Sequence, residues 1–148
     1  MNWFKKNLLS VYDSFAVRLI HMYAIVSASS IIIPDSYKDN PLYPISGFAA
    51  IVVGRTLDHL STIPAIKIIN AKEFREKTLD KGFYETNPFL GKHPTMKQYI
   101  IRSIPQDLFL LGLSVLYPPL GYSFLSLSPI IYINNKEKTK GVEKIIKG

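Results

Sequence analysis

The sequence contains no cysteine among its 148 residues. Disulfides, thiolate metal sites and cysteine nucleophiles are therefore excluded. Acidic residues are scarce as well: 11 Asp and Glu stand against 18 Lys and Arg, which gives a formal net charge of +7. A basic chain can bind nucleic acid through its phosphates. No RNA-binding aromatic motif or helix-turn-helix pattern accompanies these basic residues, so a nucleic-acid partner is not expected.

The hydrophobic fraction of 47% is ordinary for a soluble protein, but the apolar residues are gathered in blocks. The blocks cover residues 15–33, 45–69 and 99–133, and the charged residues lie between and after them. Amphipathic helices of a soluble domain would instead spread charge along every element. The distribution predicts a single domain that is all-α, a small transmembrane helical bundle of about four spans. A small soluble α-helical protein is the alternative.

The predicted membrane segments are 15–33, 45–69, 96–117 and 120–133. The first is long enough to cross a hydrocarbon layer of roughly 30 Å. The third follows a capping box formed by Thr95 and Gln98, and we expect a kink in it at Pro105. The fourth is interrupted by Pro129 and is expected to be short or re-entrant. Residues 1–14 would form an interfacial N-terminal segment, 34–44 a proline-containing loop and 134–148 a basic cytoplasmic tail.

The distribution of lysine and arginine predicts the orientation of the bundle. Lys5 and Lys6 precede the first segment, and Lys38 alone lies in the loop that follows it. Six basic residues fall between 72 and 97, and five in the tail. Four crossings would place both termini and all of these residues except Lys38 in the cytoplasm, at a bacterial inner membrane, whereas three would translocate the tail. The bilayer with its anionic headgroups is the expected partner, and a second copy or another membrane protein could also bind.

A polar group interrupts the second apolar block. Arg55, Asp58, His59 and Thr62 have three- and four-residue spacings, which place them on one face of a helix. Charged side chains at membrane depth normally face a partner or a water-filled cavity. The favoured interpretation is an Arg55–Asp58 pair that locks helix packing, with Asp107 sharing the arginine. A proton, ion or substrate site is one alternative, and a helix that ends before Arg55 is another.

A second motif follows the charged stretch and contains Glu85, Asn87, Pro88, Gly91 and His93. Asn87 can cap a turn that begins at Pro88, and Gly91 permits a left-handed residue, so a purely structural role is adequate. The functional alternative brings Glu85 and His93 to Asp58 and His59. Those four groups could ligate a divalent metal or provide acid–base catalysis, although they lack a helical HExxH spacing.

Together the pattern D-x-x-x-T at 58–62 and E-x-N-P-x-x-G-x-H-P-T at 85–95 resembles a family of small uncharacterised multi-pass membrane proteins of bacteria and tailed phages. The resemblance covers positions 55–99. It implies a helical multi-pass protein with Asp58, Thr62, Glu85, Asn87 and Pro88 as signature positions. It implies no activity and no cofactor.

Three functions follow from these observations. The leading hypothesis is a non-enzymatic membrane protein that acts through partners or on the membrane, because no recognisable catalytic constellation is present. The first alternative is an intramembrane enzyme or metal-dependent site built from Asp58, His59, Glu85 and His93. The second is a transporter or channel component in which Arg55, Asp58 and Asp107 line a polar path.

Overall fold

The computed structural model describes residues 11–12, 14–69 and 94–147, and within these ranges it is all-helical. The elements are α2 (Phe15–Ile32), α3 (Asp35–Lys38), α4 (Leu42–Ile69), α6 (Met96–Leu116) and α7 (Pro118–Lys147). The predicted all-α class is confirmed. Two of these helices, α2 and α6, are long and apolar enough to cross a membrane.

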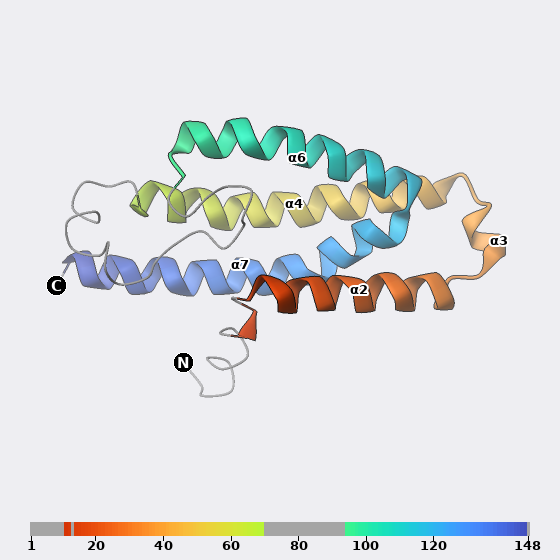
Figure 1. Ribbon diagram of the computed structural model, residues 1–148, viewed down its shortest axis with the longest axis horizontal. Coiled ribbons are helices and arrows are strands. Elements are labelled where there is room, and N and C mark those ends of the chain that lie inside the picture. The colour runs from red at the N-terminus through yellow and green to blue at the C-terminus, as the bar shows by residue number, and fades with distance from the viewer. Residues whose placement is uncertain (1–10, 13, 70–93, 148) are drawn as a thin grey trace.

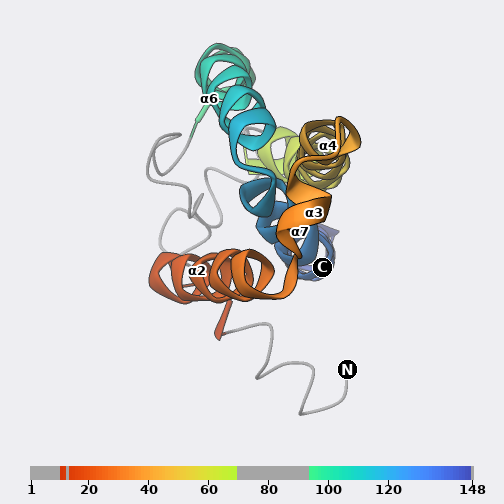
Figure 2. The ribbon, with the colours of Figure 1, turned by 90° about the vertical axis from the view of Figure 1, so that its right-hand side faces the viewer.

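The four long helices lie side by side along the long axis of the molecule, and consecutive ones run in opposite directions (Figure 1). α4 lies between α6 and α7, and α2 packs against α7 on the side away from α4 (Figure 2). The short helix α3 joins α2 to α4 at one end of the bundle, and the C-terminus lies at the other end (Figure 1). The end of the bundle that carries α3, residues 33–41, is called the α3 end below.

The closest helix packing is between α4 and α7, and it depends on glycine. A Cβ atom built on Gly121 of α7 would overlap the carbonyl oxygen of Gly47 in α4, and one on Gly47 would lie 2.6 Å from Cα of Pro118. Gly54 similarly lies against the backbone of α7 near Leu125. Small residues that let helix backbones approach are typical of helix pairs in membranes, where dispersion contacts drive association.

The boundaries of α6 follow local sequence signals. The Thr95 hydroxyl accepts a hydrogen bond from the Gln98 amide (3.2 Å), and the Gln98 side chain accepts one from the Thr95 amide (2.9 Å). The predicted capping box is therefore confirmed. At the other end a single residue, Tyr117, separates α6 from α7. Pro118 then occupies the first position of α7, where a missing amide hydrogen costs no helical bond.

The last helix differs from the prediction. The expected short segment 120–133 and separate tail 134–148 form one helix of 30 residues that continues to Lys147 and includes Pro129. Lysine and glutamate are good helix formers, and a Glu137–Lys140 pair supports the extension.

The proline-containing loop is likewise shorter than 34–44, because α4 begins at Leu42. Pro44 is accommodated in its first turn, where no helical donor is required.

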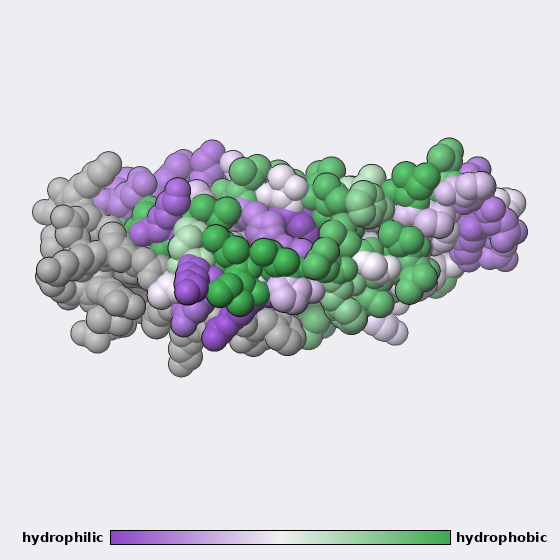
Figure 3. Space-filling view, turned by 90° about the horizontal axis from the view of Figure 1, so that it is seen from above, coloured by the Kyte–Doolittle hydropathy of each residue, from purple (hydrophilic) through white to green (hydrophobic). Residues whose placement is uncertain are grey.

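Polar and apolar side chains are both buried within the described part of the bundle, and many large apolar side chains are exposed. The buried polar or charged residues include Arg55, Ser61, Thr62, Ser114, Ser128 and Asn134. No residue of α2 is buried, and large apolar side chains are exposed along α2 and α6, among them Leu19, Ile20, Ile31, Ile104, Leu108 and Phe109. On the face that carries α6, apolar residues cover much of the surface, and hydrophilic residues lie at the α3 end, in a patch near the middle and towards the opposite end (Figure 3). An exposed apolar area of this kind marks contact with a membrane or a partner.

Candidate functional site

The arginine of α4 holds two carboxylates. Arg55 Nε donates a hydrogen bond to Asp107 Oδ1 of α6 (2.6 Å), and Arg55 Nη1 donates to Asp58 Oδ2 (2.5 Å). The predicted Arg55–Asp58 pair, with Asp107 sharing the arginine, is therefore present. Asp58 also accepts a weaker bond from the Thr62 hydroxyl (3.4 Å), so the helical face predicted from the spacing is correct. The helix passes through Gly54 without a break, which excludes the interpretation that it ends there.

His59 lies between two residues of α6. Its Nε2 atom is 2.7 Å from Asp107 Oδ2, and its Nδ1 atom is hydrogen-bonded to the Tyr99 hydroxyl. The two rings also meet edge to face, with centroids 5.7 Å apart. Arg55, Asp58, His59, Tyr99 and Asp107 thus form one connected set, called the Arg55 network below. It joins α4 to α6.

The third helix at this site is α7. Asn135 Nδ2 donates hydrogen bonds to the hydroxyls of Ser61 (3.0 Å) and Thr62 (3.3 Å). Because Thr62 in turn bonds to Asp58, the polar contacts run from α6 through α4 to α7. Chains of this kind stabilise a unique helix register, since a shift of one helix would leave several buried polar groups unpaired.

The charged members of the Arg55 network and His59 are largely enclosed. The exposed fraction of the side chain is 10% for Arg55, 22% for Asp58 and for Asp107, and 25% for His59. One guanidinium and two carboxylates sum to a formal charge of −1 when His59 is neutral, and to zero when it is protonated.

Tyr99, a member of this network, and Asn135, which contacts the neighbouring Ser61 and Thr62, were not predicted from the sequence. Tyr99, Ser103 and Asp107 recur every fourth residue and share one face of α6, and both Tyr99 and Ser103 are buried. That spacing was a signal available in the sequence. Asn135 has no comparable signal, because its partners are more than 70 residues away.

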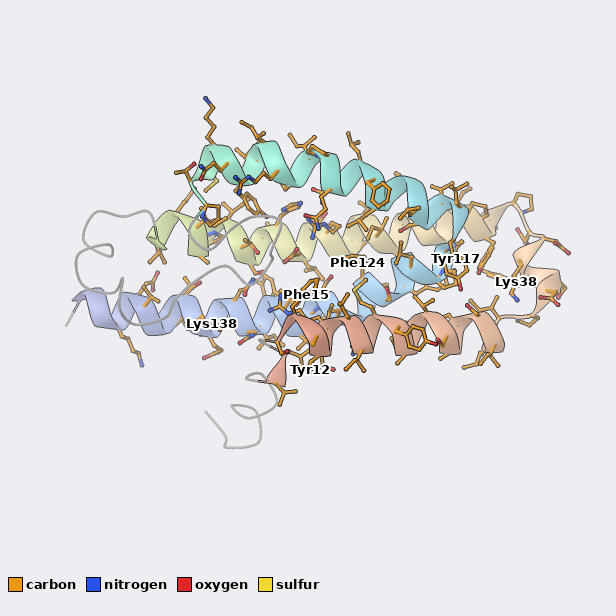
Figure 4. All side chains as sticks on the ribbon, in the orientation of Figure 1. Tyr12, Phe15, Lys38, Tyr117, Phe124 and Lys138 are labelled. Atoms are coloured by element: carbon orange, nitrogen blue, oxygen red, sulfur yellow. The ribbon has the colours of Figure 1, made fainter. Side chains whose placement is uncertain are left out.

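A smaller polar contact ties α2 to α7. One ring nitrogen of His21 is 3.0 Å from the Tyr12 hydroxyl, and the other is 3.0 Å from the Ser126 hydroxyl. Arg18 donates to the backbone carbonyl of Tyr12 (2.7 Å). Figure 4 shows Tyr12 at the start of α2, the helix that these contacts hold against the bundle.

The α3 end carries an exposed ion pair. Lys38 Nζ lies 2.8 Å from Asp35 Oδ1. The hydrogen bond from Lys38, together with its positive charge, lowers the pKa of Asp35, and the same hydrogen bond raises the pKa of Lys38. Lys38 and Tyr117 lie near one another at this end (Figure 4), where the Tyr117 hydroxyl bonds to Ser30 (2.5 Å).

The second sequence motif, Glu85, Asn87, Pro88, Gly91 and His93, lies outside the described residues. Of the four residues in the proposed metal or acid–base cluster, Asp58 and His59 are the two that the structure describes. Asp58 bonds to Arg55, and His59 bonds to Asp107. Within the described ranges, no group of three or more His, Asp or Glu side chains could hold a metal ion.

Comparison with protein families, curated proteins and solved structures found no match.

Proposed function

We propose that the chain is an integral membrane protein in which α2, α4, α6 and α7 all cross the bilayer, and that it acts through lipid and protein partners rather than by catalysis. The observation that carries the proposal is the exposure of large apolar side chains such as Ile20 and Leu108, while Arg55 is buried. In water such a surface would be strongly unfavourable, at about 25 cal/mol for each Å² of apolar area. In lipid it is matched to its surroundings.

Helix lengths support this arrangement. With a rise of 1.5 Å per residue, α2 is about 27 Å long and α6 about 32 Å. Arg55 lies about 20 Å along α4 from Leu42, and Asp107 about 14 Å from the end of α6 at Leu116. Both charges are thus within membrane depth, where mutual neutralisation is required.

The charge distribution supports an orientation with both termini in the cytoplasm. At the α3 end Lys38 is the one basic residue of the connecting sequence. Five other lysines lie in the halves of their helices that are farther from the α3 end: Lys67, Lys97, Lys136, Lys140 and Lys144. Those lysines would face anionic headgroups of the inner leaflet, with about 1 kcal/mol of attraction for each.

Single-cysteine labelling tests the proposal, because any introduced cysteine is unique in this chain. In intact bacterial cells, Ser36→Cys at the α3 end should react with a membrane-impermeant maleimide. Lys144→Cys near the end of α7 should react only after the cells are opened. Leu108→Cys on the apolar face of α6 should react in neither case until the protein is denatured. Labelling of Leu108→Cys in intact membranes, or of both end positions from the same side, would contradict the four-span arrangement.

A transport component is the second candidate function, and the Arg55 network favours it. Polar groups that connect three helices at membrane depth are typical of ion pathways. Protein in liposomes should then carry protons or small cations down an imposed gradient, and Asp107→Asn should reduce the flux at least about tenfold. Flux that is equal in protein-containing and empty liposomes would reject this candidate and leave the partner-binding role.

A further inference from the structure

We propose that the α3 end binds the headgroup of a zwitterionic phospholipid, in which Lys38 and Tyr43 hold the phosphate and Asp35 holds the ammonium group. The inference rests on the proposed function, because the α3 end meets the outer leaflet only if the long helices cross the bilayer. It goes beyond that function by naming the class of lipid and the residues that select it.

Lys38 is held in place by two elements and keeps one donor for a ligand. Its Nζ atom lies 2.8 Å from Asp35 Oδ1 of α3 and 3.3 Å from the backbone carbonyl oxygen of Ser30, near the end of α2. An ammonium group has three donor hydrogens, and Lys38 uses two of them among the described residues. The remaining hydrogen can be donated to a phosphate oxygen from a position that α2 and α3 already fix.

A tyrosine beside Lys38 offers a second donor. Tyr43 is 9% exposed, and its ring meets that of Tyr37 edge to face with centroids 5.7 Å apart. Among the residues that the structure describes, the Tyr43 hydroxyl makes no hydrogen bond, whereas the hydroxyls of Tyr117 and Tyr122 are both bonded to serines. Lys38 lies close enough to Tyr43 for an electrostatic interaction. Because the hydroxyl of an enclosed tyrosine usually has a partner, an acceptor that reaches both residues accounts for it.

The charges at the α3 end favour a zwitterionic headgroup over an anionic one. Residues 33–41 contain Asp35 and Asp39 against Lys38, which sums to a formal charge of −1. Asp35 is the outer member of the ion pair, with 93% of its side chain exposed against 34% for Lys38. A purely anionic headgroup would bring its negative charge against two carboxylates. A headgroup that also carries an ammonium group gives Asp35 a cationic partner.

Binding of such a headgroup would replace one ion pair with two. The Lys38–Asp35 pair is exposed, so it contributes little to the stability of the fold by itself. When the lipid binds, Lys38 donates to the phosphate and Asp35 accepts from the ammonium group, so no charge is left without a partner. Tyr37 and Tyr43 suit this position, because tyrosine rings are favoured where the hydrocarbon layer meets the headgroups.

Native mass spectrometry of the full chain in detergent tests the proposal, with phosphatidylethanolamine and phosphatidylglycerol added separately. We expect wild type to retain one phosphatidylethanolamine at this site. Lys38→Ala should weaken that binding by about tenfold, the effect of losing one hydrogen bond to a charged group. Tyr43→Phe keeps the ring contact and removes only the hydroxyl, and it should weaken the binding by about fivefold. Phosphatidylglycerol binding, which the lysines of the opposite end support, should be unchanged in both variants.

The matched control is Lys144→Ala, which removes a lysine near the end of α7 and should leave phosphatidylethanolamine binding unchanged. Phosphatidylethanolamine binding that is the same in Lys38→Ala and Tyr43→Phe as in wild type would overturn the site. An equal loss of both lipids in Lys38→Ala would overturn the choice of a zwitterionic headgroup. If Lys38→Ala does not fold, Tyr43→Phe decides by the same two comparisons. Cysteine labelling tests the four spans without reference to Lys38 or Tyr43, so failure of one conclusion is distinguishable from failure of the other.

Discussion

Replacing Arg55 with alanine is expected to lower the free energy of unfolding by about 3 kcal/mol. The change would leave Asp58 and Asp107, which share this arginine at 2.5 and 2.6 Å, without a positive partner. Loss of one member of an enclosed ion pair is costly because the remaining charge stays desolvated. Unfolding in detergent, followed by circular dichroism against temperature or denaturant, measures the effect.

Two further variants separate the causes. Arg55→Lys keeps the charge but cannot present two donors in a fixed plane to Asp107 and Asp58, so it should restore part of the lost stability. Lys38→Ala breaks an ion pair that is exposed to solvent and should leave the unfolding transition unchanged. Arg55→Ala with wild-type stability would show that the network contributes nothing to the packing of α4 on α6.

Replacing Gly121 with alanine is expected to destabilise the bundle by about 3 kcal/mol through steric overlap between α4 and α7. The new methyl group would collide with the carbonyl oxygen of Gly47 and would lie 3.0 Å from its carbonyl carbon. These are backbone atoms, which cannot turn aside as a flexible side chain can, so the two helices must separate along their closest contact. The same unfolding measurement in detergent reports the loss.

Gly112→Ala provides a matched control within the same protein. No atom lies within 4 Å of the Cβ that it would add, and Gly112 is in the interior of α6. Alanine there should stabilise the chain by up to about 1 kcal/mol, because alanine favours helix over glycine. A destabilised Gly121→Ala variant beside a Gly112→Ala variant at least as stable as wild type would support the packing, whereas a Gly121→Ala protein as stable as wild type would contradict it.

The local features of the fold were accessible from the sequence. The capping box at Thr95 was predicted correctly, because it depends on residues three positions apart. The shared face of Arg55, Asp58 and Thr62 was predicted for the same reason. The extension of α7 to Lys147 was missed, because a basic tail of good helix formers is compatible with both coil and helix until it has a surface to pack against.

The membrane character of the chain likewise follows partly from its sequence and partly from its tertiary structure. The blocks of apolar residues and the asymmetry of lysines are properties of the linear chain, and they supported the hypothesis of a helical membrane protein. Burial of Arg55 and Ser114, together with exposure of Ile20 and Leu108, depends on which helix faces meet. Only the assembled bundle could reveal which side chains are buried and which are exposed.

The sequence by itself determined that α6 begins at the Thr95 capping box and ends before Pro118, and which polar side chains of α4 share a helix face. These properties follow from contacts between residues a few positions apart. The tertiary structure decided that α4 lies between α6 and α7, that Gly47 meets Gly121, and that Tyr99 and Asp107 complete the site of His59. Such contacts join residues 40 or more positions apart. They are set by the close approach of helix backbones at glycine and by the need to pair each enclosed charge, neither of which is visible in local spacing.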